Sequence, residues 1–175
     1  MKGVMALVAL SPIRKAHCTI SGEIPILAKN GTKMKDMKVH LAVAETIIRF
    51  TSAVKRINRM AFWANVSLKE IKLSSNITVI QGDALSGGRE LETIKLPMRL
   101  RKMCSLSGQE KLEKIVMPDS ITNMQSAMFS ECKKLKYIKL PAKIREIKSY
   151  DFAGCKKLKK LTIPESVKTV SMSAF

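Results

Sequence analysis

The sequence repeats itself every 23 residues, and this period limits the chain to a few architectures. The prolines Pro118, Pro141 and Pro164 are separated by this interval, and the residues around them share one apolar pattern. The aligned segments read KLEKIVMPDSITNM, KLKYIKLPAKIREI and KLKKLTIPESVKTV. A unit this short cannot bury its apolar face alone, so neighbouring units must stack and share a continuous core. The period therefore predicts a solenoid.

Three further copies extend the array toward the N-terminus. ELETIKLPMRLRKM places Pro97 in the proline position, SLKEIKLSSNITVI places Ser74 there, and the weaker ETIIRFTSAVKRI places Thr51 there. The interval that follows Pro97 is two residues shorter than the others, which indicates a shortened connector around 101–105. We predict one repeat domain over residues 45–175, with about five repeats, a degenerate first copy and an incomplete last coil.

Each copy contains a short strand that ends at the proline position. In the pattern L-x-x-I-x-L the last two apolar residues are two apart, so they face the same side of a strand. Proline then removes a backbone donor and ends the strand. In the last full copy, the residues expected to point inward are Phe152, Leu158, Leu161, Ile163, Val167 and Val170.

A second apolar position lies six residues before the first leucine of each copy. It holds Phe62, Leu85, Leu106, Phe129 and Phe152. Phe175 follows at the same interval, at the end of the sequence. We expect Phe175 to be the first buried position of a further coil. The chain is then either a fragment of a longer array or a protein with an open last coil, through which we expect self-association or fraying.

The segments AMFSECKKLKYIKLPAKIREI and DFAGCKKLKKLTIPESVKTV resemble the leucine-rich repeats of the BspA-like, or Treponema-type, family. The resemblance covers residues 57–175 well and 45–56 weakly. It implies a mainly β solenoid, a right-handed superhelix with a parallel concave sheet and short strands or turns on the back. It also implies a binding role without catalysis or cofactors, often as an adhesin-like protein that is secreted or at the cell surface.

Residues 1–44 carry no copy of the repeat, and we expect a small, irregular, β-rich cap that covers the first coil. Asn30-Gly31 lies between alternating segments and predicts a hairpin. The opening MKGVMALVAL is a poor secretion signal, because it has one charge, a short apolar run and no small-residue cleavage site. A buried first strand is the favoured interpretation, and a trimmed signal is the alternative.

The four cysteines predict no zinc site, because none of their spacings is that of a zinc ribbon. Cys132 and Cys155 occupy the same position in successive copies and therefore stack. Strands about 4.8 Å apart are close enough for a disulfide, but parallel side chains do not give the required dihedral angle near 90°. We therefore favour free, buried thiols over a disulfide. His17, Cys18 and His40 lack a third ligand or an orienting acid, so we expect neither a metal site nor a catalytic site there.

The chain is strongly basic, with 32 Lys and Arg against 14 Asp and Glu and a net charge of +18. Stacking places the outward residues of successive strands in two columns that are mostly basic. The candidate binding residues are Arg49, Lys72, Lys95, Lys139 and Thr162 in one column and Lys114, Tyr137 and Lys160 in the other. Like charges that face each other across strands are unfavourable, so the columns favour an anionic partner. The alternative is that lysine keeps an edge-rich solenoid soluble, which we favour for the lysines of the turns CKKLK and CKKLKK.

Three hypotheses for function follow. The first is a protein-binding or adhesion module that uses the concave face. The second is a binder of an acidic polymer: sulfated glycan, lipopolysaccharide or, less favoured, nucleic acid, because Tyr137 is the one aromatic residue in the columns and bases need stacking partners. The third is a structural piece of a longer repeat protein. We expect no small-molecule substrate and no enzyme, because the sequence has no glycine loop, nucleophile elbow or paired-carboxylate motif.

Overall fold

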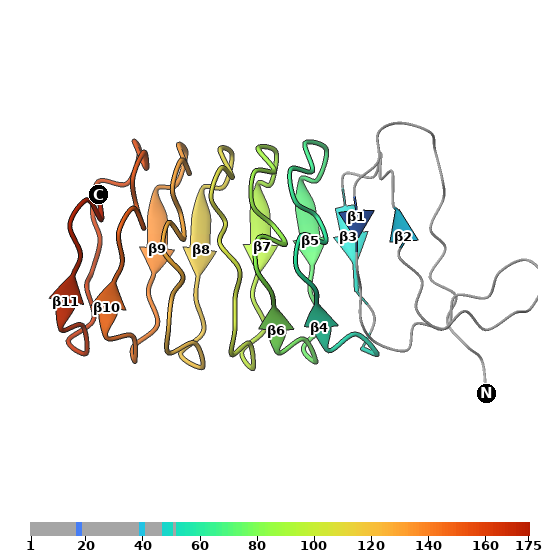
Figure 1. The fold of residues 1–175 in the computed structure, drawn as a ribbon, viewed down its shortest axis with the longest axis horizontal. Coiled ribbons are helices and arrows are strands. Elements are labelled where there is room, and N and C mark those ends of the chain that lie inside the picture. The colour runs from blue at the N-terminus through green and yellow to red at the C-terminus, as the bar shows by residue number, and fades with distance from the viewer. Residues whose placement is uncertain (1–16, 19–38, 41–46, 51) are drawn as a thin grey trace, which may run out of the picture.

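The computed structural model describes residues 17–18, 39–40, 47–50 and 52–175. It shows a parallel β-solenoid of about five turns, in which successive coils lie side by side along the long axis (Figure 1). No helix occurs in the described part of the chain. The predicted solenoid is therefore confirmed, whereas the handedness of the superhelix and the concavity of its sheet stay predictions.

One row of strands comes from the x-I-x segment before each proline position, and we call its outer surface the front face. The row contains β3 (Ile47–Arg49), β5 (Glu70–Lys72), β7 (Thr93–Lys95), β8 (Lys114–Val116) and β9 (Tyr137–Lys139). The pairing is parallel and in the register of the repeat, with Ile71 opposite Ile94 and Ile115 opposite Ile138. The central isoleucine of β5, β7, β8 and β9 is buried and at least one flanking residue is exposed, as the period of two requires.

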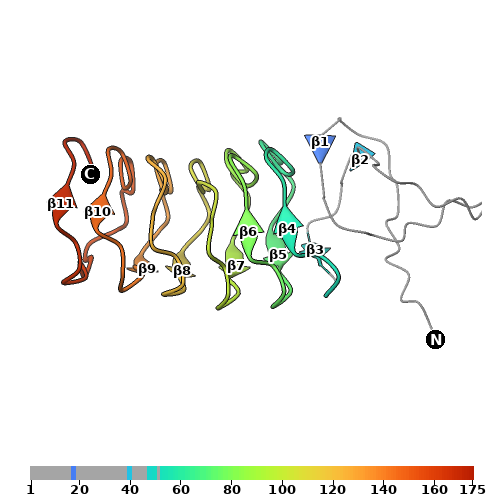
Figure 2. The same cartoon turned by 60° about the horizontal axis from the view of Figure 1, so that its bottom comes forward.

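A second row lies on the other side of each coil and runs in the opposite direction (Figures 1 and 2). It contains β4 (Arg56–Ile57), β6 (Val79–Ile80), β10 (Glu146–Ile147) and β11 (Thr169–Val170). β4 pairs with β6, β10 pairs with β11, and an isolated bridge joins Val79 to Lys102. We call this row the back ladder.

The aromatic position forms a continuous stack through the later coils. The rings of Phe129 and Phe152 stack with centroids 5.8 Å apart, and those of Phe152 and Phe175 stack at 5.4 Å. Phe175 therefore occupies the predicted position, and it is 64% exposed. Ile163 and Val170, which we expected to point into a core, are also exposed.

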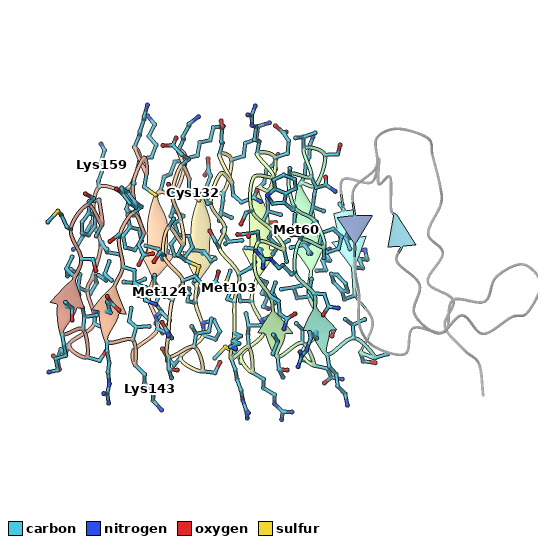
Figure 3. The ribbon with its side chains drawn as sticks, viewed as in Figure 1. Met60, Met103, Met124, Cys132, Lys143 and Lys159 are labelled. Carbon is cyan, nitrogen blue, oxygen red and sulfur yellow. The ribbon has the colours of Figure 1, made fainter. Side chains whose placement is uncertain are left out.

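Methionine fills the middle of the core. The four methionines at or beside the repeat positions are buried: Met103, Met117, Met124 and Met128. Met103 and Met124 lie within the stack of coils (Figure 3). The flexible methionine side chain fits the irregular space left where one connector is two residues shorter than the others.

The short connector changes the pairing of the front strands. Only Cys104 and Ser105 separate the last apolar residue of the back, Met103, from the aromatic position at Leu106. Before this short connector the front strands form the sheet β3–β5–β7, and after it they form a separate sheet, β8–β9. The two missing residues were visible in the sequence, but the interruption of the sheet was not predicted.

A ladder of side-chain hydrogen bonds links the turns that follow the aromatic position. Three side chains each donate to a carbonyl of the preceding coil: Gln109 to Leu85, Cys132 to Leu106 (3.3 Å) and Cys155 to Phe129 (3.1 Å). The thiols are free, as predicted, although Cys155 is half-buried rather than buried. Desolvation raises the pKa of Cys132, and it raises the pKa of Cys155 to about 11, so both stay protonated donors at neutral pH.

Two short strands are described before the repeats. β1 (His17–Cys18) pairs antiparallel with β2 (Val39–His40), and His17 lies opposite His40 in the register. The rest of the predicted cap, including the Asn30-Gly31 hairpin and the opening apolar run, lies outside the described residues. The boundary between the cap and the repeats therefore stays a prediction.

Candidate functional site

The candidate binding residues all lie on the outer side of the coils. Arg49, Lys72 and Lys95 are paired in register across β3, β5 and β7, and all three are exposed. In the second sheet, Lys114 lies opposite Tyr137 and Val116 lies opposite Lys139. Lys160 and Thr162 are also exposed, but they belong to no strand. The structure thus aligns most of the predicted residues, whereas their role in binding stays a prediction.

The front face carries one basic side chain in every coil. We call this set the basic row, and its members are Arg49, Lys72, Lys95, Lys114, Lys139 and Lys160. Because neighbouring strands are about 4.8 Å apart, the row spans roughly 24 Å along the solenoid. The cation lies in one column in some coils and two residues away in others, which separates neighbouring charges.

Few neighbours on the front face neutralise the basic row. Lys72 forms an ion pair with Glu70 of its own strand at 3.3 Å. The ammonium group of Lys114 lies 5.0 Å from the centroid of the Tyr137 ring, a cation–π distance. Within the described residues, Lys95, Lys139 and Lys160 form no ion pair. The face is therefore positively charged and its cations are open to a partner.

Apolar side chains lie among these cations. Tyr137 is 49% exposed and Val116 is 45% exposed, and both lie on the β8–β9 sheet beside Lys114 and Lys139. Exposed tyrosine and aliphatic side chains gain more from contact with a partner protein than from exposure to water, and the basic side chains around them can pair with acidic groups of that partner. The sequence pattern predicted Tyr137 as a binding residue but not Val116, because Val116 carries no charge in a column that is mostly basic.

The turn lysines make contacts that sequence analysis missed. Three ion pairs connect successive coils: Lys111 with Glu90 (2.7 Å), Lys136 with Glu113 (2.9 Å) and Lys133 with Glu110 (3.1 Å). The hydrogen bond from Lys136 lowers the pKa of Glu113. The signal was present in the sequence, because each acid precedes its lysine by about the length of one repeat.

Other turn lysines form no ion pair among the described residues. They are Lys134, Lys156, Lys157 and Lys159, and all are exposed. This second positive surface borders the front strands, because Lys134 and Lys114 line the same depression. It provides a matched comparison for the basic row, because four exposed lysines can be changed in either set.

Comparison with known sequences settles the family. Six copies of the BspA type Leucine rich repeat region match residues 43–107 and 102–175. The chain belongs to the BspA-type leucine-rich repeat family. The predicted family is therefore confirmed, and proteins built from this repeat are generally non-enzymatic binding proteins. No curated protein matches the sequence.

Solved bacterial proteins share the fold of this BspA-type chain. A leucine-rich repeat protein from Bacteroides ovatus is 28% identical with a TM-score of 0.67, and the match covers 71% of this chain and 33% of that one. The T. pallidum leucine-rich repeat protein is 26% identical with a TM-score of 0.68 and covers 71% and 60%. Pneumococcal vaccine antigen PcpA is 23% identical with a TM-score of 0.59 and covers 74% and 37%, which shows the fold alone.

This BspA-type chain therefore spans between about a third and three fifths of the length of those relatives. In the part that the structure describes, no helix is long and apolar enough to cross a membrane. The same part of the chain contains no group of three or more histidine, cysteine, aspartate or glutamate side chains placed to hold a metal ion.

Proposed function

We propose that this BspA-type repeat chain is a non-enzymatic binding module that holds a partner protein against its front face. The observation that carries the proposal is the mixture of exposed Tyr137 and Val116 with the unneutralised cations of the basic row. Tyrosine supplies a large, rigid contact, and the lysines favour acidic side chains around it. The partner surface that fits is therefore acidic with an apolar centre, as in an adhesion contact.

Selection from a displayed peptide library tests this proposal, because the library itself supplies the candidate partner sequences. Peptides selected on the wild-type chain should be rich in acidic and apolar residues, and Tyr137→Ser should weaken their binding about tenfold or more. Tyr150→Ser is the matched control, because Tyr150 is exposed to a similar degree but lies on a turn. Equal losses in the two variants, or none in Tyr137→Ser, would contradict the proposal.

A second candidate function is the binding of a linear polyanion along the basic row. The specific observation is the spacing, one cation per coil over roughly 24 Å, which runs parallel to the solenoid axis. A sulfated glycan presents charges at repeated intervals and has no need of aromatic stacking. Its binding should weaken steeply as salt rises, whereas an apolar protein contact should depend on salt far less.

A further inference from the structure

The back ladder is interrupted at one coil. In three coils the residue that follows the buried aliphatic of the turn donates its amide to the preceding coil: Thr78 to Lys55 (2.9 Å), Arg101 to Thr78 (2.8 Å) and Lys168 to Arg145 (2.7 Å). Thr122 and Arg145 hold the same position in their coils. Among the described residues, no hydrogen bond joins Thr122 to Arg101 or Arg145 to Thr122.

A side-chain hydrogen bond between coils is also missing beside this gap. The hydroxyl of Ser120 donates to the Leu100 carbonyl at 2.7 Å, and the hydroxyl of Ser166 donates to the Ile144 carbonyl at 2.6 Å. Lys143 occupies the same position in the coil between them. Its long side chain extends outward from the edge of the solenoid (Figure 3) and makes no such hydrogen bond.

An open depression of about 730 Å³ lies at the gap. It spans three coils and is lined by Thr122, Asn123, Lys143, Arg145, Glu146 and Ser166. A depression of this volume is larger than an inorganic ion needs and is in the range of small-ligand sites. Ala142 completes the lining, which combines hydroxyl groups, an amide and two cations with aliphatic carbon.

The cationic side chains around the depression are not used within the described residues, whereas the Ser166 hydroxyl is taken up by the Ile144 carbonyl. Lys143 and Arg145 are exposed and form no ion pair there. The Arg145 amide, which by its register points toward the preceding coil, lacks the acceptor that its equivalents have. Glu146, the one acid in the lining, accepts a hydrogen bond from Ser171 of the following coil at 3.3 Å.

We propose that this depression binds a small ligand through an oxyanion group: a sulfate ester, a phosphate ester or a carboxylate. The guanidinium of Arg145 gives two parallel donors, Lys143 adds a second charge, and the free amide of Arg145 adds a third directed donor. Hydroxyl and amide groups of Thr122 and Asn123 suit the polar remainder of a sugar-sized ligand. The site is independent of the front face and of the proposed protein partner.

Amide hydrogen exchange of the wild-type chain tests the gap itself. The Arg145 amide should exchange quickly, while the amides of Arg101 and Lys168, which have acceptors, should exchange slowly. Slow exchange at Arg145 in the free protein would overturn the proposal, because the gap would then be closed.

Titration followed by the same amide signals tests the ligand. The probes are N-acetylglucosamine 6-sulfate, glucose 6-phosphate and glucuronic acid, with neutral N-acetylglucosamine as the reference. Signals of Arg145 and Asn123 should shift and saturate with the charged probe that fits, and the probes together identify the source of the oxyanion. Arg145→Gln should weaken that binding about tenfold.

Lys168→Gln is the control, since it removes one exposed charge from the same position of the next coil. It should leave the affinity within about twofold of the wild type. Shifts spread over every lysine-rich turn, equal weakening in the two variants, or no shift at Arg145 with any charged probe would each contradict the site. The neutral sugar should produce no saturating shift, and saturation by it would also count against an oxyanion site.

Discussion

Single positions determine how closely the coils approach one another. At Gly88 a Cβ atom would lie 2.8 Å from Gln109 Nε2 and 2.9 Å from the carbonyl oxygen of Asn65. Any side chain at Gly88 would push neighbouring coils apart, so the position requires glycine. The apolar register was readable from the sequence because it recurs in every copy. The polar ladder that includes Gln109 could not be predicted from the sequence. Its position holds Gly88, Gln109, Cys132 and Cys155 in successive coils, and these residue types share no common chemistry.

Phe152 carries the most direct prediction at the residue scale. It is buried between the stacked rings of Phe129 and Phe175, so Phe152→Ala should lower the free energy of unfolding by about 3–5 kcal/mol. Lys157→Ala, on an exposed turn, should change it by less than about 0.5 kcal/mol. Denaturant unfolding measures both variants, and equal midpoints would contradict the register of the repeat.

Two carboxyl groups should have pKa values that are shifted in opposite directions. Burial raises the pKa of Asp151, whose oxygens accept the amides of Met128 (3.1 Å) and Lys148 (2.7 Å). The hydrogen bond from Lys136 lowers the pKa of Glu113. In a titration followed by carboxyl NMR signals, the pKa of Asp151 should therefore lie above 3.8 and that of Glu113 below 4.5.

The two groups make opposite contributions to stability. The folded pKa of Asp151 is above its ordinary value of 3.8, so its contribution rises as pH falls through the folded pKa. The contribution of Glu113 to stability is present at pH values above its ordinary pKa of 4.5, and it is lost as pH falls through its lowered folded pKa. A pKa of Glu113 at or above 4.5 would contradict the ion pair, and a pKa of Asp151 at or below 3.8 would contradict the effect of burial.

At the scale of elements, the strands could be predicted from the repeat, but the break in the front sheet could not. The x-I-x segment before each proline position predicts a strand wherever it occurs, and β5, β7, β8 and β9 each carry a buried isoleucine there. The break between β7 and β8 depends on how a two-residue deletion on the back shifts the coil. Register across a sheet is a property of neighbouring coils, so no single copy of the motif contains it.

The gap in the back ladder predicts a stabilising substitution. In the two neighbouring coils the same position holds Ser120 and Ser166, and each hydroxyl donates to a carbonyl of the preceding coil. Lys143→Ser places a hydroxyl at this position in the coil between them. If the new hydroxyl bonds the Ile121 carbonyl, the free energy of unfolding should rise by about 0.5–1.5 kcal/mol. Lys168→Ser removes the same charge without a new tie and should be neutral. A lower denaturant midpoint for Lys143→Ser than for Lys168→Ser would contradict the expected hydrogen bond.

The basic row predicts retention on heparin. Changing Lys95, Lys114, Lys139 and Lys160 together to serine should abolish retention at moderate salt, because these side chains form one row on the front face. The control changes Lys134, Lys156, Lys157 and Lys159 to serine, which removes the same charge from the turns. Greater loss in the control would assign polyanion binding to the turns instead.

At the scale of the whole molecule, the repeat period was sufficient to predict the solenoid, because stacking is the only way for such short units to bury their apolar residues. The period carries no information about residues 1–44, which lack it, and the predicted cap stays a prediction. Ile163 and Val170 of the last coil are more exposed than their counterparts Leu140 and Ile147 in the preceding coil. Self-association through this coil also stays a prediction.

The central claim is that the front face is the binding surface, and side-chain NMR tests it most directly. A peptide selected on the wild-type chain should shift the methyl signals of Val116 and the ring signals of Tyr137, both exposed on the β8–β9 sheet. The methyl signals of Val66, which is exposed on a turn, should stay in place and serve as the reference. Shifts at Val66 with none at Val116 and Tyr137 would contradict the account.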